Sequence, residues 1–398
     1  MSENLARPTL SRSPARRMSQ IEPFHVLAVL EQARAMEQEG RSVIHMEVGE
    51  PDFATADQIV AAGIRALQDG CAGYSQALGI PELRRAIADS YPVAARPDWS
   101  RVIVTPGSSG ALQLIFGVIV NPGDQVLMTD PGYPCNRHFV RMFEGNAQMI
   151  PVDAATNYQL TADMVRHHWS DRSVAVMLAS PANPTGTVVT ADEMERLIDA
   201  VRELGGVLIV DEIYHGLTYG FDSQTVLHSS SEVFVVNSFS KYYCMTGWRM
   251  GWLVSPSAYV DTINRLAQNV FISSSTPAQY ACLAAFDPVV RQEMERRRQI
   301  FCRRRDFLVP ALRDLGFKIS VVPQGAFYVY ADCSAFTDDS YAFALDILAN
   351  TGVALAPGVD FGCHRANEYV RFSYANDLEK LREGVRRIGK YLSCELSE

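Results

Sequence analysis

The feature of this sequence that most limits its fold is a regular alternation of short apolar runs with longer helical patterns over residues 100–255. Helical spacing fills the segments between several runs, for example residues 110–120 and 191–204. Consecutive parallel strands need such crossovers, so the alternation predicts an α/β fold in which helices cover a mostly parallel sheet. The runs that we expect to form strands are 102–104, 125–129, 174–179, 207–210, 233–236 and 251–254.

Helical and strand-like patterns also flank this alternation. Apolar side chains recur at helical spacing over residues 21–39, which indicates one amphipathic helix. After Pro277 a long helical region extends to about residue 315, and strand-like pieces follow at 318–322 and 326–330. This C-terminal part predicts a second, smaller α+β unit. Since no Gly/Ser/Pro-rich linker occurs, we expect packing to make the division between domains.

The C-terminal helical region is rich in arginine, with seven between residues 291 and 305, which raises the question of a nucleic-acid surface. Met294, Phe301 and Leu308 recur every seven residues, so one side of the helix is expected to pack inward. The arginines are then expected to form a solvated face together with Glu293 and Glu295. They are Arg291, Arg296, Arg297, Arg298, Arg303, Arg304 and Arg305.

Charge and composition argue against several classes of protein. The chain has 36 basic and 45 acidic residues, and its net charge of -9 disfavours binding to nucleic acid or to an anionic membrane. Its longest apolar stretch, residues 111–120, is far shorter than the roughly 20 residues that a membrane span needs. The eight cysteines form no CxxC pair, which is typical of a reducing compartment. We therefore expect a cytoplasmic protein with neither a nucleic-acid nor a membrane partner.

Common metal, hydrolase and dinucleotide signatures are absent from the sequence. His167 and His168 lie in a helical stretch without a metal-binding signature, and HExxH does not occur, so no metal site is predicted. GxSxG and GxGxxG do not occur either. The chemistry of this chain must therefore be sought in other residues.

Polar side chains follow three of the predicted strands directly. Ligands of an open parallel sheet bind at the carboxyl ends of its strands, so these side chains are candidates for one shared crevice. The run 207–210 leads to Asp211 and Tyr214, the run 233–236 leads to Ser238, Ser240 and Lys241, and the run 174–179 leads to Asn183. A carboxylate, a lysine, a tyrosine and an amide are thus expected to converge.

A further strand-like run, residues 101–104, leads into a segment of glycine and serine at the start of an apolar helix. Free N–H groups at a helix N-terminus, with small residues that permit close approach, form an anion site suited to phosphate. Ser108 and Ser109 lie at this position, and Arg249 is a candidate for a bidentate contact to the same anion. Taken alone, the segment is better explained as an ordinary helix N-cap formed by Ser108 or Ser109.

A phosphate cradle, a lysine after one strand and an acid after a neighbouring strand are the parts needed to hold pyridoxal phosphate. In these parts the chain resembles the fold-type I pyridoxal-phosphate-dependent aminotransferases of class I/II, in the branch of the aspartate and aromatic aminotransferases. The resemblance rests on an ordered series of motifs from about residue 20 to the C-terminus. The motifs are Gly49-Glu50-Pro51-Asp52-Phe53, Gly73-Tyr74-Ser75 with Gly79 and Leu83-Arg84, Asp130-Pro131-Gly132-Tyr133-Pro134, Asn183-Pro184-Thr185-Gly186, Asp211-Glu212-Ile213-Tyr214, Ser238-Phe239-Ser240-Lys241 through Gly247-Trp248-Arg249, Gly325-Ala326-Phe327-Tyr328 and Val370-Arg371-Phe372-Ser373.

The resemblance implies a domain organisation. A large cofactor-binding domain, residues 49–285, would contain a mostly parallel seven-stranded sheet covered by helices. A smaller α+β domain would comprise residues 286–398, with the N-terminal segment 21–48 packed against it. Residues 1–20 carry two prolines that would break a presequence helix, and we expect them to form a flexible tail.

The resemblance also implies catalytic roles. Lys241 would form the Schiff base with pyridoxal phosphate and then act as the base at the substrate Cα. Asp211 would pair with the pyridinium nitrogen, and Tyr214 would contact the phenolic oxygen with the help of Asn183. Tyr133 would stack on the pyridine ring.

The remaining implied roles concern the phosphate and the substrate. The phosphate would be held by Ser108, Ser109, Ser238, Ser240 and Arg249. Tyr74 would reach it from the neighbouring subunit, which implies a homodimer. Arg371 would bind the substrate α-carboxylate, and the Gly49 backbone would close the other side. No metal takes part.

The implied activity is a ping-pong transamination between an L-amino acid and a 2-oxo acid. A β-lyase or a decarboxylase on the same fold is the alternative, because motifs do not encode how the substrate is oriented. The ligand-sensing half of some transcription regulators shares the fold, but the short N-terminal segment and the negative charge argue against it. Loops near Phe24, Phe327 and Phe361 could make the pocket apolar and suit neutral amino acids.

Overall fold

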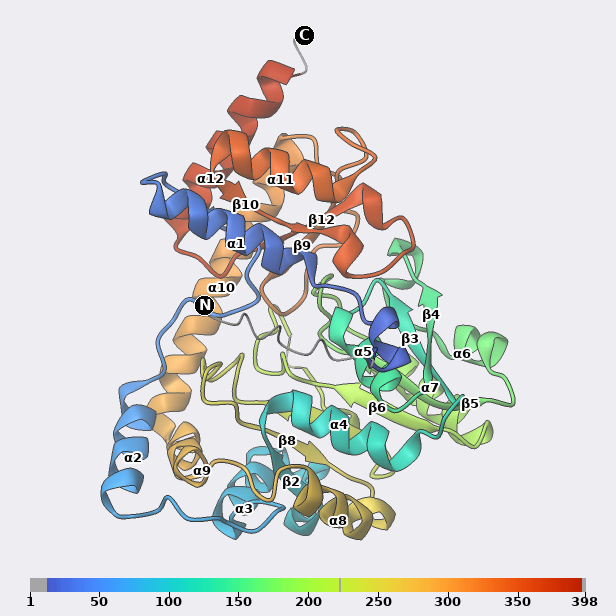
Figure 1. Ribbon diagram of the computed structural model, residues 1–398. Coiled ribbons are helices and arrows are strands. Elements are labelled where there is room, and N and C mark those ends of the chain that lie inside the picture. The colour runs from blue at the N-terminus through green and yellow to red at the C-terminus, as the bar shows by residue number, and fades with distance from the viewer. Residues whose placement is uncertain (1–12, 222, 396–398) are drawn as a thin grey trace, which may run out of the picture.

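The computed structural model describes residues 13–221 and 223–395 (Figure 1). The first 12 residues of the expected N-terminal tail lie outside this part of the chain. Within the rest of that segment, Arg16–Gln20 forms a 3-10 turn. The Arg17 guanidinium donates a hydrogen bond to the carbonyl of Met142, at the end of a helix of the large sheet's layer.

The centre of the molecule is a seven-stranded sheet, as expected, in the order β2-β8-β7-β6-β5-β3-β4. Every neighbouring pair is parallel except those of β8, which runs antiparallel to both β2 and β7. The strands are β2 (Val102–Thr105), β3 (Gln125–Asp130), β4 (Asn146–Pro151), β5 (Ser173–Ala179), β6 (Val207–Asp211), β7 (Phe234–Ser238) and β8 (Gly251–Val254). The mostly parallel α/β fold predicted from the alternation is therefore confirmed.

Six of these strands coincide with the apolar runs because side chains on both of their faces are buried. In β6, Ile209 packs into one hydrophobic cluster while Leu208 and Val210 pack into another on the opposite face. Strand β4 was not predicted from the sequence. This strand pairs only with β3, at the sheet edge, and most of its side chains are half-buried, so it shows no apolar run.

Helices cover both faces of this sheet (Figure 1). One cluster is built from α4 and α8, and the other from helices that include α3, α7 and α9. The helices of this layer are α2 (Asp57–Gln68), α3 (Pro81–Ser90), α4 (Gly107–Ile119), α5 (Pro134–Met142), α6 (Ala162–His168), α7 (Ala191–Glu203), α8 (Val260–Val270) and α9 (Thr276–Leu283).

A smaller α+β unit combines the two ends of the described chain. Figure 1 shows the blue helix α1 against the orange and red C-terminal elements, and β1 pairs in parallel with β10. A second, antiparallel sheet has the order β11-β12-β9. The elements are α1 (His25–Gln38), β1 (Ile44–His45), α10 (Pro288–Asp314), β9 (Tyr328–Asp332), α11 (Ser340–Thr351), β10 (Val353–Ala354), β11 (Ala356–Pro357), β12 (Tyr369–Ser373) and α12 (Leu378–Glu395).

Two expectations for the C-terminal part are corrected. The helical region after Pro277 is not continuous, because Pro288 begins a new helix, α10, whose first turn is capped by the side chain of Asp287. The piece at 318–322 is not a strand, since Lys318 makes only an isolated bridge to Asp332 within the described chain.

The arginine-rich helix α10 is only partly a solvated face. Met294, Phe301 and Leu308 are buried as predicted, and Glu293 and Glu295 bind several of the arginines. The prediction fails most clearly for Arg304, and Arg297 and Arg305 are also largely covered. Arg304 is buried and binds both carboxylate oxygens of Asp52, at 2.7 and 2.8 Å. Helix α10 therefore anchors the loop that follows Gly49.

Among residues 13–221 and 223–395, no helix combines the length and the apolar composition needed to cross a bilayer.

Candidate active site

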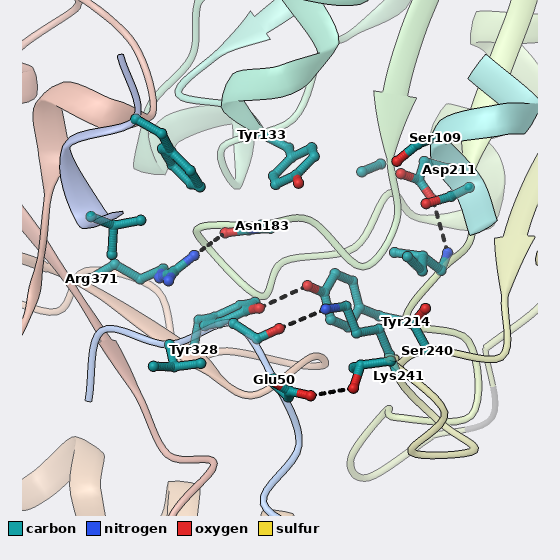
Figure 2. A pocket seen from close by; sticks show the side chains of 18 of the residues that line it. Glu50, Ser109, Tyr133, Asn183, Asp211, Tyr214, Ser240, Lys241, Tyr328 and Arg371 are labelled. Atoms are coloured by element: carbon teal, nitrogen blue, oxygen red, sulfur yellow. Dashed lines mark hydrogen bonds between the residues drawn. The ribbon is translucent and has the colours of Figure 1, made fainter. Parts of the chain in front are cut away.

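A cavity of about 340 Å³ lies at the carboxyl ends of β5, β6 and β7, closed on its other side by α1 and β12. It brings together most of the side chains singled out from the sequence (Figure 2). Those that line it are Gly49, Ser108, Ser109, Tyr133, Asn183, Asp211, Tyr214, Ser240, Lys241, Arg249 and Arg371. Figure 2 shows Arg371 at one end of the cavity and Asp211 with Ser109 at the other.

Lys241 lies in the turn that follows β7. Its Nζ donates a hydrogen bond to the carbonyl of Gly49 at 2.6 Å. Burial lowers the pKa of Lys241 from 10.5 to about 8; the charge of Glu50 opposes this shift, and that of Arg371 adds to it. An appreciable fraction of the amine is therefore neutral, and nucleophilic, near neutral pH.

Asp211 is the last residue of β6 and is buried in the cavity wall. One carboxylate oxygen, Oδ1, accepts a hydrogen bond from the N–H of Ile213 at 3.0 Å. Burial raises the pKa of Asp211 from 3.8 to about 7, although the Ile213 hydrogen bond and the charge of Lys241 act in the opposite direction. A carboxylate so poorly solvated favours a cationic partner in the cavity.

Aromatic side chains form two opposite walls. Tyr133 lies on one side, and the hydroxyls of Tyr214 and Tyr328 share a hydrogen bond of 2.8 Å on the other (Figure 2). Burial raises the pKa of Tyr214 well above its ordinary value, so this phenol stays neutral. A Cβ on residue 49 would lie 2.8 Å from the Tyr328 hydroxyl, so glycine is needed for the backbone to approach this closely.

The start of α4 forms an anion cradle with Arg249. Gly107 has a φ of 68°, and a Cβ added there would lie 2.6 Å from Nη2 of Arg249. The guanidinium therefore rests against the first turn of the helix, beside Ser108 and Ser109, and Nη1 donates to the carbonyl of Thr246 at 3.0 Å. Helix N–H groups, small hydroxyls and a guanidinium together suit a phosphate group.

Arg371 lies in β12 and is buried. Its Nη1 donates to Oδ1 of Asn183 at 2.9 Å, and its Nη2 donates to the carbonyl of Glu47 at 2.5 Å. The guanidinium also stacks 4.3 Å from the ring centroid of Tyr328. Contacts on three sides fix the group before any ligand binds, which suits it to hold a carboxylate in a defined orientation.

Two predicted site residues do not line the cavity. Strand β7 continues two residues beyond its apolar run, so Ser238 is still part of the sheet and is buried. Its hydroxyl lies 2.8 Å from that of Ser240 and accepts a hydrogen bond from the Ser240 N–H. Ser238 therefore positions Ser240 without lining the cavity itself. Tyr74 lies in the loop between α2 and α3 and is 83% exposed.

The cavity also contains residues to which the sequence analysis gave no role. Glu50 accepts a hydrogen bond from the hydroxyl of Thr246, which ties the Gly49 loop to the loop after Lys241. Glu50 and Tyr328 belong to two of the family-like motifs, but nothing in the sequence indicated where their side chains point. Phe24 lines the cavity as anticipated, whereas Phe327 and Phe361 are buried behind its wall and do not line it, with the Phe361 ring packed against Arg371. In the described part of the chain, no group of three or more His, Cys, Asp or Glu side chains could hold a metal ion.

Comparisons with known proteins agree with this geometry. Residues 41–388 match the family described as Aminotransferase class I and II. The valine--pyruvate aminotransferase of Mycobacterium tuberculosis is 39% identical over 94% of this chain and 97% of its own length.

Solved structures give the same result. The crystal structure of an aminotransferase from Mycobacterium tuberculosis has a TM-score of 0.93 at 38% identity and covers 96% of this chain and 100% of its own. The Thermus thermophilus aspartate aminotransferase with maleate has a TM-score of 0.89 at 32% identity, and covers 95% of this chain and 99% of its own. The chain therefore belongs to the class I and II aminotransferases and is a transferase of the fold-type I architecture.

Proposed function

We propose that this protein is a pyridoxal-phosphate-dependent aminotransferase that moves the amino group of an L-amino acid to a 2-oxo acid in two half-reactions. The observation that carries the proposal is the convergence, in one cavity, of a lysine with a lowered pKa, a buried aspartate and an anion cradle. The valine and pyruvate in the name of the 39% identical relative support an amino acid and a 2-oxo acid as the two substrates.

The residues present fit the proposed cofactor. Its phosphate matches the cradle of Ser108, Ser109, Ser240 and Arg249, and its ring nitrogen, once protonated, supplies the cation that buried Asp211 favours. When bound, the cofactor ring withdraws electrons from the substrate Cα and so stabilises the charge left there by proton loss.

The other side chains would hold the cofactor and the substrate in place, and one of them would move a proton. Lys241 would be the point of covalent attachment and, once the substrate amine has displaced it, would be the base that moves the proton from the substrate Cα to the cofactor C4′. Tyr214 and Asn183 would contact the phenolic oxygen, and Tyr133 would stack on the ring. Arg371 holds the substrate α-carboxylate.

Assembly is part of the proposal. Tyr74 is exposed on the protomer, and we infer that it contacts the phosphate bound by the neighbouring subunit of a homodimer.

The proposal also includes a division into two domains, residues 49–285 and 286–398, with residues 21–48 packed on the smaller one. All eight cysteines, each within the described residues, are free, which supports a cytoplasmic location.

The test is the visible absorption of the protein loaded with pyridoxal phosphate. Addition of an L-amino acid without a 2-oxo acid should bleach the cofactor band and release one oxo acid per site, with no ammonia. Release of ammonia and pyruvate from a cysteine conjugate would indicate a β-lyase instead, and release of carbon dioxide a decarboxylase. The Lys241→Ala variant should show no turnover.

A further inference from the structure

Helix α1 has two apolar faces that serve different purposes. Val29, Ala33 and Met36 are buried against α11 and β10 of the smaller unit. Leu27 and Leu30, together with Phe24 just before the helix, instead line the cavity. Leu27 is 52% exposed, so an apolar side chain lies uncovered at the cavity wall.

The start of α1 is held in place from the smaller unit. The buried carboxylate of Asp360 accepts hydrogen bonds from the N–H groups of His25 and Val26, each at 2.7 Å. An acidic group at this position satisfies free N–H groups and complements the helix dipole. Since β12, which carries Arg371, belongs to the same unit, the apolar face of α1 is fixed relative to the guanidinium that is proposed to bind the α-carboxylate.

Every basic side chain found on the cavity wall already has a role. In the described parts of the chain, the basic residues that line the cavity are Lys241, Arg249 and Arg371. The nearby Arg137 does not line it, and its guanidinium is bound to Glu22 at 3.0 Å. Within one protomer, a second carboxylate on the substrate would therefore meet the apolar side chains of α1, without a further cation to balance its charge.

We propose that Phe24, Leu27 and Leu30 form the subsite for the substrate side chain, and that the enzyme selects L-amino acids with neutral apolar side chains over dicarboxylic ones. This inference rests on the proposed transamination. Leu27 and Leu30 are the specificity-determining residues, because a substrate side chain gains by covering them and an ionised one loses its solvation there.

The experiment measures kcat/KM of the pyridoxal-phosphate-loaded protein for L-leucine, L-valine, L-alanine, L-aspartate and L-glutamate. We expect kcat/KM to be higher for the apolar amino acids than for L-aspartate and L-glutamate. The Leu27→Ala and Leu30→Ala variants should lower kcat/KM for L-leucine by about 10-fold and leave that for L-alanine nearly unchanged, because a methyl group does not reach the subsite. Leu67→Ala, on an exposed leucine of α2 outside the cavity, is the matched control and should change neither value.

A gain of function completes the test. The Leu27→Arg variant should raise kcat/KM for L-glutamate relative to L-leucine. The inference is overturned if the unmodified enzyme prefers L-aspartate or L-glutamate, or if Leu27→Ala lowers the values for leucine and alanine equally. If no amino acid bleaches the cofactor band of the loaded protein, the proposed function itself fails. That outcome differs from an enzyme that turns over only acidic donors.

Discussion

Replacement of Asp211 by asparagine should stabilise the cofactor-free protein while it abolishes activity. The carboxylate is buried beside the cavity, and its pKa is raised from 3.8 to about 7, chiefly by burial. A folded-state pKa above the unfolded one means that the folded protein binds more protons through this group. The free energy of unfolding that Asp211 contributes therefore falls as the pH rises from about 4 to about 7.

The magnitude follows from the size of the pKa change. One pKa unit corresponds to about 1.4 kcal/mol, so a rise from 3.8 to about 7 costs about 4 kcal/mol of stability at pH 8 and less than half of that at pH 5. An asparagine keeps the acceptor for the Ile213 N–H but carries no charge. Its stability gain should therefore be larger at pH 8 than at pH 5 by about 3 kcal/mol.

Urea unfolding of the cofactor-free protein and of the Asp211→Asn variant, at equal protein concentration and at both pH values, measures this difference. Asp171→Asn, on an exposed aspartate, is the control. Pyridoxal phosphate should then stabilise the unmodified protein more than Asp211→Asn, since the cofactor brings the cation that the carboxylate lacks. A gain that is the same at pH 5 and pH 8 would refute the claim that Asp211 is held at a cost in stability.

Asp52→Asn leaves the buried Arg304 guanidinium without a charged partner and should lower the free energy of unfolding by about 3 kcal/mol, measured in urea; an unchanged value would mean that the pair does not anchor the Gly49 loop. Arg371→Lys loses the bidentate contact that is proposed to hold the substrate α-carboxylate. It should raise KM for the amino acid by about 10-fold or more, with a smaller change in kcat. Gly107→Ala should weaken binding of pyridoxal phosphate because its Cβ would displace Arg249, whereas Gly123→Ala, also at positive φ but with no atom near its Cβ, should not; equal affinities in a fluorescence titration would argue against the cradle.

Much of the large sheet could be predicted because its inner strands are buried on both faces and therefore appear as continuous apolar runs. The polar residues after those runs converge because neighbouring parallel strands end at the same edge of the sheet. Strand β4 could not be found this way, because most of its side chains are only half-buried. The end of β7 could not be predicted either. The polar residues Asn237 and Ser238 still pair with β8, so Ser238 belongs to the sheet and does not line the cavity.

Pairing between distant side chains was the harder part to predict. The heptad of α10 indicated which face packs inward, yet nothing in it distinguished buried Arg304 from the more exposed arginines of the helix, because the partner Asp52 lies far away in the sequence. Helix α1 showed the same limit. Its periodicity predicted an amphipathic helix, but a second apolar face directed at a cavity requires the tertiary structure.

The pairing of β1 with β10 has a consequence for how the molecule is made. Ile44 and His45 are synthesised long before their partners Val353 and Ala354. Closing so long a loop is slow, and early segments wait without their partners. Helix α1 packs on α11 and is capped by Asp360, so it too has no docking surface until then. On the ribosome, the substrate side of the cavity is therefore completed only after the large sheet has been synthesised.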